Sequence, residues 1–330
     1  MPVLVLSRTQ TESLLDLDAL RNALRTAMED VSAGRGSMPP RIAALVGDKG
    51  LLAAMPAYLP TGGLAAKLVS LFPGNAGSRL PTHQAVMVVF DADSGQPVAL
   101  MDGTSITALR TAAGSALSAE LLAREDAETV AILGTGVQAR AHAEAMVRVR
   151  PIRRIRVAGR NRDHAVSLSS ALEDSLGIPV QAVDTYAEAC ADADVVCAAT
   201  HSPDPVVCRD YLRPGVHVTS VGYNTAGREV DTATVVDAMV VVEARDAVLA
   251  PPPAGSNELR TPIQQGLIGP EHIEAEIGEL LLGTKPGRRS PAQITLYKSV
   301  GIAAQDVAAA RLVLDAARGK NLGLEVDLSA

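Results

Sequence analysis

The sequence predicts an α/β protein built around a doubly wound parallel sheet, and three observations support this fold class. Short β-branched runs alternate with longer helical patterns between residues 129 and 242, as they do where helices connect parallel strands. These runs are numerous enough for a complete sheet of this kind. The 330 residues suffice for two domains of roughly 150 residues each, and the flanking segments lack the alternation.

The predicted strands are rich in β-branched residues, which favour extended backbone. They are Thr129–Leu133, Ile155–Ala158, Val180–Val183, Val195–Ala199, His217–Val221 and Met239–Val242. The helical patterns between them lie near Val137–Arg148, Asp163–Leu176 and Thr185–Ala191. This order of elements predicts the parallel sheet.

The flanking segments predict a different, α+β architecture. Val86–Phe90 and Pro97–Leu100 are strand-like and are joined by DADSGQ, a sequence typical of a hairpin loop. EHIEAEIGELLLG has the period of an amphipathic helix, and a last helical pattern runs from about Lys298 to Arg318. Glycine inside a helix costs about 1 kcal/mol, so we expect Gly301 near the start of this helix.

The composition argues against nucleic acids and membranes as partners. The chain is 47% hydrophobic and 20% charged, which is typical of a globular protein. Its net charge of -7 and 2% aromatic content provide neither the positive field nor the stacking surfaces that single-stranded nucleic acids need. No stretch approaches the roughly 18 consecutive apolar residues that span a bilayer.

The three cysteines, Cys190, Cys197 and Cys208, match neither a disulfide framework nor a zinc site in number and spacing. They predict free thiols in a reducing compartment. The six histidines lack the spacing of metal ligands, so we predict no metal. The first residues also lack the basic region and cleavage site of a signal peptide. We therefore expect a cytoplasmic protein.

A glycine-rich turn follows the first predicted strand, where TVAIL leads into GTGVQA. In such a turn Gly134 allows the tight bend, Gly136 lets a pyrophosphate approach the backbone, and Ala139 lets helix and strand pack closely. The phosphates bind the free amide groups at the helix amino end. The motif also occurs in ordinary loops, but the strand before it and the α/β series after it favour a Rossmann dinucleotide-binding domain. The expected contacts are Gly134, Thr135, Gly136, Val137, Gln138 and Ala139.

The end of the second strand indicates which dinucleotide binds. An acidic residue there accepts hydrogen bonds from the free ribose of NAD, but this sequence has Arg160, Asn161 and Arg162 in VAGRNRD. Guanidinium groups suit a 2′-phosphate. NADP is therefore preferred over NAD as the cofactor, although two solvated surface arginines are the alternative interpretation.

Three cationic residues precede the sheet: Arg41 in MPPRIAAL, Lys67 in GGLAAKLVSLFPGN and Arg110 in DGTSITALRTAAGSA. Taken singly, each fits a surface charge. Apolar and small residues flank Lys67 and Arg110 on both sides, which predicts partly buried charges, and such a charge needs a carboxylate. The surrounding sequence offers few acids, so we expect a substrate carboxylate to be the partner.

Four separated motifs resemble the ornithine cyclodeaminase and mu-crystallin family: GLAAKLVSLFPGN, ITALRTAAGSA, VAILGTGVQARAH and LYKSVGIAAQDVAAA. Together they cover essentially the whole chain in the family's order. The family exchanges hydride between a nicotinamide and the α-carbon of an amino or imino acid. The resemblance implies a substrate-binding and dimerisation domain at residues 1–122 with 302–330, a Rossmann domain at 123–301, and a homodimer.

The resemblance also implies roles for individual residues. Arg41, Lys67 and Arg110 would contact the substrate carboxylate, and Lys67 either handles a proton as well or only donates to the carboxylate. Thr82 or His83, in LPTHQAVMVVF, would border the same pocket. Further cofactor contacts are expected at Thr200, Ser220, Val221, Gly222, Ser299, Val300 and Gly301.

One position departs from the cyclodeaminase pattern. Cyclodeaminases have an aspartate in a VGxDxPGKxE-like motif, whereas this sequence reads VGYNTAGREVD and has Asn224 there. An amide cannot act as a base near neutral pH, although its oxygen can accept a hydrogen bond from an amine. This departure argues against aspartate-dependent cyclodeamination.

The leading functional hypothesis is NAD(P)H-dependent reduction of an α-imino acid, a ketimine, to an L-amino acid, or the reverse dehydrogenase reaction. Two alternatives remain open. One is cyclodeamination of a diamino acid with bound NAD. The other is a small-ligand or NADP-binding protein that resembles mu-crystallin and has little turnover.

Overall fold

The computed structural model describes residues 2–224, 227–252 and 254–329. Within these ranges the chain divides into two compact units: the residues up to Arg110 with those from Ile302 onward, and Thr111–Gly301. The first boundary lies inside helix α3 (Gly103–Leu122), which contributes residues to both units. None of the described helices is long and apolar enough to cross a membrane.

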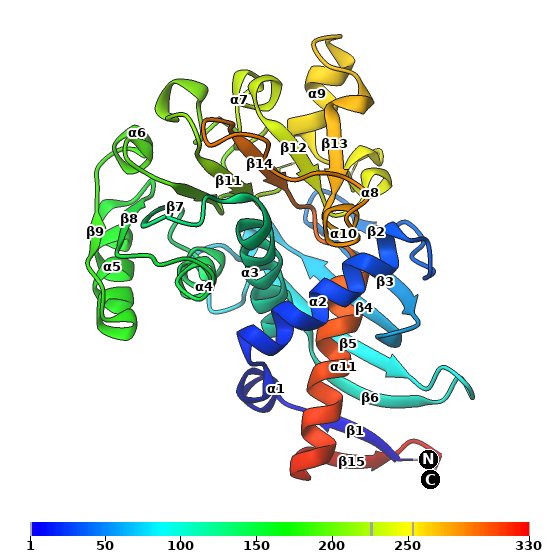
Figure 1. Cartoon of the computed structure of the whole chain (residues 1–330). Helices are drawn as coiled ribbons and strands as arrows, with labels where there is room; N and C mark the ends of the chain where they lie inside the picture. The colour runs from blue at the N-terminus through cyan, green and yellow to red at the C-terminus, as the bar shows by residue number, and fades with distance from the viewer. Residues whose placement is uncertain (1, 225–226, 253, 330) are drawn as a thin grey trace. The chain divides into compact units, whose positions relative to one another are not determined.

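The first unit contains a sheet whose described strands are ordered β15-β1-β6-β5-β4-β3-β2 (Figure 1). Its strands are β1 (Pro2–Leu6), β2 (Ile42–Val46), β3 (Gly50–Leu59), β4 (Gly63–Leu71), β5 (His83–Phe90), β6 (Pro97–Asp102) and β15 (Leu324–Asp327). Its helices are α1 (Arg8–Leu14), α2 (Leu17–Ser32), α11 (Ala303–Lys320) and the first half of α3. The predicted hairpin is confirmed, because β5 and β6 pair antiparallel.

Side chains alternate between the two faces of this sheet. In β4, Ala65, Lys67 and Val69 are buried on the face that α11 covers, because every second side chain of a strand points to the same side. On the opposite face, Leu68 and Val86 lie in register and are 38% and 41% exposed. The sheet therefore has one covered face and one open, largely apolar face.

The second unit contains an all-parallel sheet, ordered β13-β12-β14-β11-β10-β7-β8-β9 over the part of the chain that the structure describes. Its strands are β7 (Thr129–Leu133), β8 (Arg154–Ala158), β9 (Val180–Ala182), β10 (Val195–Ala198), β11 (His217–Ser220), β12 (Met239–Val242), β13 (Ile273–Glu276) and β14 (Thr295–Lys298). Its helices are α4 (Val137–Met146), α5 (Arg162–Leu176), α6 (Tyr186–Cys190), α7 (Thr232–Asp237), α8 (Arg245–Leu249), α9 (Asn257–Gln264) and α10 (Ile277–Leu281). The α/β fold class and the six predicted strands are confirmed.

Near the carboxyl end, one predicted element was wrong and the start of another was misplaced. The segment expected to form one amphipathic helix splits into β13 and α10, because Ile273 and Ala275 alternate into the sheet before the helical period begins. The last helix is present but begins at Ala303, and Lys298, its expected start, ends the inner strand β14. Gly301 has a φ of 73°, a left-handed conformation that favours glycine and ends the turn before α11.

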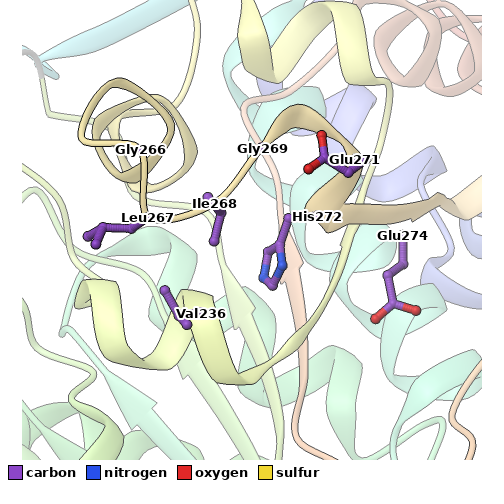
Figure 2. A pocket seen from close by; sticks show the side chains of 8 residues that line it. All are labelled: Val236, Gly266, Leu267, Ile268, Gly269, Glu271, His272 and Glu274. Carbon is purple, nitrogen blue, oxygen red and sulfur yellow. The ribbon is translucent and has the colours of Figure 1, made fainter.

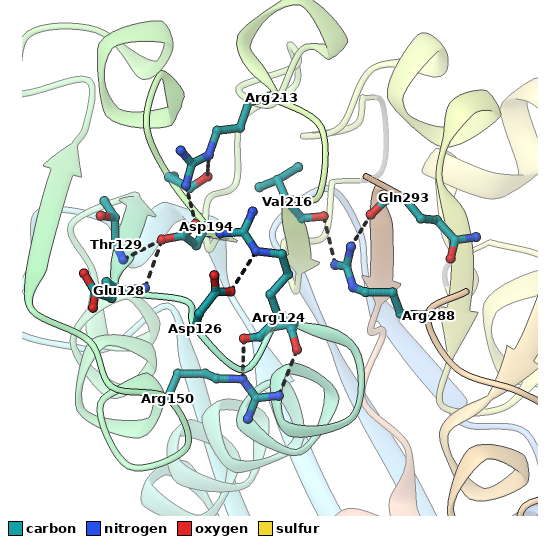
Figure 3. Close-up of polar contacts among 12 residues, drawn as sticks. Arg124, Asp126, Glu128, Thr129, Arg150, Asp194, Arg213, Val216, Arg288 and Gln293 are labelled. Atoms are coloured by element: carbon teal, nitrogen blue, oxygen red, sulfur yellow. Dashed lines mark hydrogen bonds and ion pairs between the residues drawn. The ribbon is translucent and has the colours of Figure 1, made fainter. Parts of the chain in front are cut away.

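Two arginine side chains hold the carboxyl end of α3, and Figure 3 shows the first of them, Arg150, bonded to Arg124. Arg150 donates to the carbonyls of Glu120, Ala123 and Arg124 at 2.8 to 2.9 Å, and Arg288 donates to that of Leu122 at 2.7 Å. The last carbonyls of a helix have no partner within the helix and carry partial negative charge, so guanidinium groups stabilise them. These contacts fix the carboxyl end of α3 within the second unit.

Two buried histidines lie in a hydrogen-bonded network at the core of the second unit. His142 donates from Nδ1 to the carbonyl of Gln138 at 2.7 Å, and its Nε2 lies 2.9 Å from Ser115 Oγ. His217 lies between Ser118 Oγ at 3.1 Å and Thr295 Oγ1 at 2.9 Å. Burial lowers the pKa of His142 to about 4 and that of His217, which also faces Arg288 and Arg150, to about 3. Both rings are therefore neutral at pH 7.

We expect the protein to lose stability as the pH falls from 6.5 to 5. In this range the histidines of the unfolded chain bind protons that the folded protein does not, so protons favour unfolding. Each pH unit costs roughly 1.4 kcal/mol per histidine when the group is fully protonated in the unfolded state. Urea titrations at several pH values measure the slope, and His142→Gln should make it shallower. A flat profile over this range would contradict the neutral buried rings.

Candidate functional site

The turn after β7 has the geometry of a dinucleotide site. Gly134 has a φ of 118°, and a Cβ there would lie 2.5 Å from the carbonyl oxygen of Ala199, so only glycine fits. Gly136 differs, because a Cβ there would meet nothing within 4 Å. Ala139 is fully buried in the packing of α4 on the sheet. Gly134 and Ala139 must therefore be small because of the bend and the helix packing, whereas the space around Gly136 is open.

The amino end of α4 follows directly on this turn. Gly136 is its N-cap and supplies no side-chain hydrogen bond, which leaves the first-turn amide groups of the helix for another acceptor. Val137, the first residue of the helix, is 65% exposed. Gln138 Oε1 is buried and has no hydrogen-bond partner among the described residues. These features fit a bound dinucleotide.

The three polar residues at the end of β8 differ in their surroundings. Asn161 is the N-cap of α5 and accepts from the amide of His164 at 3.1 Å. Arg162 pairs with Asp184 at 3.0 Å. Arg160 is exposed and forms no ion pair with any residue that the structure describes. Of the two arginines expected at a 2′-phosphate, Arg160 is therefore the one that is not already paired.

Glu229 connects the ends of β10 and β11. Its carboxylate accepts from the amide and hydroxyl of Thr200 at 2.9 Å, from Ser220 Oγ at 2.8 Å and from the amide of Gly222 at 2.6 Å. Gly222 must be small here, because a Cβ would lie 2.4 Å from that carboxylate. The donor groups of three expected cofactor contacts thus point to an internal acid. Val221, between them, donates its amide to the carbonyl of Ala198.

Glu243 holds the turn before α11 in the same way. It accepts from Ser299 Oγ at 2.7 Å and from the amides of Val300 and Gly301 at 2.9 and 3.0 Å. Lys298, one residue earlier, is fully buried and donates to Ser220 Oγ and the carbonyl of Gly222. The polar atoms of Ser299–Gly301 therefore serve to shape the loop, which leaves its other atoms to contact a cofactor.

In the first unit, Lys67 and Arg110 meet on one acidic side chain. Lys67 Nζ lies 2.7 Å from Asp306 Oδ2, and Arg110 Nε lies 3.0 Å from Asp306 Oδ1. Arg110 also donates from Nη1 to Gln305 Oε1 at 2.7 Å. All four side chains are at most 6% exposed. The predicted burial of the two cations is confirmed, but the expectation that the chain provides no carboxylate for them was wrong, because α11 supplies Asp306.

The buried charges shift each other's protonation. Burial, aided by the positive charges of Arg110 and Arg41, lowers the pKa of Lys67 from 10.5 to about 8, against the opposing effect of Asp306. Burial alone would raise the pKa of Asp306, but the charges and hydrogen bonds of Lys67 and Arg110 keep it below its ordinary value. At neutral pH, Asp306 is therefore ionised and Lys67 lies close to its titration point. Such a lysine suits proton transfer.

The other predicted substrate residues also belong to the first unit. Arg41 is half-buried directly before β2, and its charge acts on Lys67. Thr82 and His83 are half-buried at the start of β5, where His83 pairs with Leu71 of β4. Arg41 is thus linked to the Lys67 cluster by the effect of its charge, which lowers the pKa of Lys67.

Asn224 has both ends of its amide engaged. Its Nδ2 donates to the carbonyl of His201 at 2.9 Å, and its Oδ1 accepts from the amide of Gly227 at 3.0 Å. The oxygen that was expected to accept from an amine nitrogen is thus already bonded within the loop. Here Asn224 organises the loop after β11.

Sequence reasoning missed Gln305 and Asp306. The signal was present in LYKSVGIAAQDVAAA, because an adjacent amide and acid inside an otherwise apolar helix are costly to bury without a partner. Glu229 and Glu243 were also missed as residues that shape loops. Their partners come from segments distant in sequence, which only the fold reveals.

The cavity shown in Figure 2 lies apart from these residues. It is a shallow depression of about 620 Å³ lined by Val236, Gly266, Leu267, Ile268, Gly269, Glu271, His272 and Glu274. The imidazole of His272, which lines this depression, already donates a hydrogen bond to the carbonyl of Val235 at 2.7 Å. None of the expected site residues lines this depression.

A family model for ornithine cyclodeaminase and mu-crystallin proteins matches residues 2–321. The chain belongs to this family. It is 34% identical over 327 residues to the alanine dehydrogenase of Archaeoglobus fulgidus, and the match covers 99% of this chain and 98% of that protein. The predicted family is thus confirmed.

Solved structures of the family match the fold closely. The Δ1-pyrroline-2-carboxylate reductase of Thermococcus litoralis, in complex with NADH and L-proline, matches with a TM-score of 0.94 and 35% identity, covering 98% of this chain and all of that one. An archaeal alanine dehydrogenase dimer with bound NAD matches with a TM-score of 0.93 and 33% identity, covering 99% of this chain and all of that one. Both neighbours act on small amino or imino acids.

Proposed function

We propose that this family member is an NAD(P)H-dependent oxidoreductase that reduces an α-imino acid to an L-amino acid, or catalyses the reverse reaction. The observation that carries the proposal is the buried cluster in which Lys67 and Arg110 share Asp306. Two cations face one internal carboxylate, with Arg41 adding positive charge. This surplus favours a substrate carboxylate.

The residues have separate tasks in this reaction. The amides after Gly136 would bind the pyrophosphate of the dinucleotide, which supplies the hydride when bound. Arg110 and Arg41 would hold the substrate carboxylate and so orient the imine. Lys67 would donate a proton to the imine nitrogen while the imine carbon receives the hydride, which gives a neutral amine. Asp306 stays ionised and keeps Lys67 in place.

A panel of cyclic and open-chain imino acids, assayed with NADPH and NADH, tests this function. Loss of nicotinamide absorbance that depends on the imino acid, without release of ammonia, is the expected result. Ammonia release without net cofactor oxidation would indicate cyclodeamination of a diamino acid instead. Binding of a dinucleotide without any turnover would indicate a ligand-binding protein.

We also propose that NADP is the preferred cofactor, because Arg160 is exposed and free of ion pairs with the described residues. Arg160→Glu should raise the KM for NADPH at least tenfold, roughly the contribution of one charge-assisted pair, and leave the KM for NADH almost unchanged. Arg162→Glu is the matched control, because Arg162 already pairs with Asp184. If Arg160→Glu changed the KM for NADPH and the KM for NADH equally, Arg160 would not contact the 2′-phosphate.

A homodimer is the proposed assembly, with the open face of the first sheet packed against a second copy. Its apolar side chains, including Leu68 and Val86, form the kind of exposed patch that marks an interface. The double variant Leu68→Lys, Val86→Lys should be monomeric in light scattering. Val166→Lys in α5, 48% exposed, should leave the assembly unchanged. A dimer that survives the double variant would place the interface elsewhere.

A further inference from the structure

Gln305 has a fixed orientation next to Arg110. Its Oε1 accepts from Arg110 Nη1 at 2.7 Å and, more weakly, from the amide of Ile302 at 3.4 Å. A guanidinium group can only donate hydrogen bonds, so the oxygen of the amide must face it. The opposite assignment would place two donors against each other. The position of Nε2 is therefore determined by Arg110.

The nitrogen of the same amide is an unmatched donor. Gln305 is fully buried, and Nε2 has no hydrogen-bond partner among the described residues. A buried donor without a partner is unfavourable, and such groups in native structures call for an explanation. Within this cluster Lys67 and Arg110 pair with the Asp306 carboxylate, and Gln305 Oε1 accepts from Arg110. Asp306 Oδ2 is also buried without a hydrogen bond among the described residues, and its contact at 2.7 Å is the ion pair with Lys67 Nζ. Gln305 Nε2 thus still needs an acceptor.

The chemistry of that acceptor follows from the charges around it. The nitrogen and oxygen of the Gln305 amide are held close by covalent geometry, so an oxygen that accepts from Nε2 also lies near the Arg110 guanidinium, which donates to Oε1. The two positive charges of Arg110 and Lys67 exceed the single negative charge of Asp306. A carboxylate oxygen satisfies both the donor and the charge.

We propose that Gln305 is a substrate-binding residue whose Nε2 donates a hydrogen bond to a carboxylate oxygen of the imino acid. The inference rests on the proposed function, and it adds a neutral donor to the cations that hold the carboxylate. Arg110 has two tasks in this arrangement: it binds the carboxylate and orients the amide that binds beside it. Gln305 thus helps to select an acid over an uncharged analogue.

Gln305→Glu tests the proposal, because it preserves the oxygen facing Arg110 and replaces only the NH2 group by an oxygen. The new oxygen repels a substrate carboxylate but accepts from a carboxamide. We expect the KM for the best imino acid to rise at least tenfold, with kcat changed less than threefold. The ratio of kcat/KM for the carboxamide analogue over the acid should rise at least tenfold. Gln96→Glu, an exposed residue of the same unit, is the matched control.

A binding measurement separates this proposal from the proposed function. Calorimetry of L-proline with the NADH-loaded protein should show binding by the wild type and by Gln96→Glu, and at least tenfold weaker binding by Gln305→Glu. If the wild type binds L-proline but reduces no imino acid, the proposed reaction fails and this comparison still decides the role of Gln305. Equal affinities, unchanged preference for the acid, or no binding of L-proline by the wild type would each overturn the proposal.

Discussion

Replacing Lys67 by methionine is expected to lower kcat for imino-acid reduction at least a hundredfold, since a positioned proton donor contributes roughly 10² to 10⁴ in rate. Under the proposed mechanism, protonated Lys67 is the active form for reduction. Its pKa of about 8 predicts that kcat/KM stays level below pH 8 and falls above it. The reverse reaction needs neutral Lys67 and should rise over the same range. Pre-steady-state and steady-state rates from pH 6 to 10 measure both profiles.

Two variants distinguish proton transfer from simple attraction of the carboxylate. Lys67→Arg keeps the positive charge but does not titrate in this range, so the fall above pH 8 should disappear along with most of the activity. Asp306→Asn removes the charge that raises the pKa of Lys67, so the fall should begin at lower pH. If Lys67→Arg retains full activity, Lys67 serves only to bind the carboxylate.

Gly136→Asp is expected to weaken dinucleotide binding at least a hundredfold while the protein stays folded. The added side chain would point into open space, because no atom lies within 4 Å of a Cβ at this position. The fold should tolerate it, but a carboxylate beside the first turn of α4 would repel the pyrophosphate and occupy its place. Titration of the cofactor and thermal melting measure the two effects separately.

Matched substitutions in the same turn provide the controls. Gly136→Ala adds only a methyl group and should cost much less affinity. Gly134→Ala should show the opposite pattern, with a marked loss of stability, because its Cβ would lie 2.5 Å from the carbonyl of Ala199 and the φ of 118° is unfavourable for alanine. Tight dinucleotide binding by Gly136→Asp would move the cofactor site away from this turn.

The second unit follows from the sequence more fully than the first. Its strands β7 to β12 are short apolar runs between helical segments, so each is recognisable from local pattern. Strand β14 was not predicted because it contains Lys298, whose buried charge is compensated by hydrogen bonds to Ser220 and Gly222 and by Glu258 at 3.3 Å. Local pattern cannot reveal a buried lysine whose partners come from other segments of the chain.

The candidate site was predicted in part for the same reason. The neighbours of Lys67 and Arg110 in sequence are apolar and small, and this local signal correctly indicated burial. Their acid lies 196 residues after Arg110, on α11, and no local signal links the two. Roles that depend on such partners, including those of Gln305, Glu229 and Glu243, need the assembled fold.

The placement of Asp306 has a consequence for biosynthesis. A ribosome makes Lys67 and Arg110 long before it makes the acid that joins them. Until then, burying the two cations would leave their charges uncompensated, which is strongly unfavourable. The continuous second unit, by contrast, is complete once Gly301 has emerged. We therefore expect the second unit of a nascent chain to become resistant to proteases before the first unit does. The first unit should become resistant only after α11 leaves the exit tunnel.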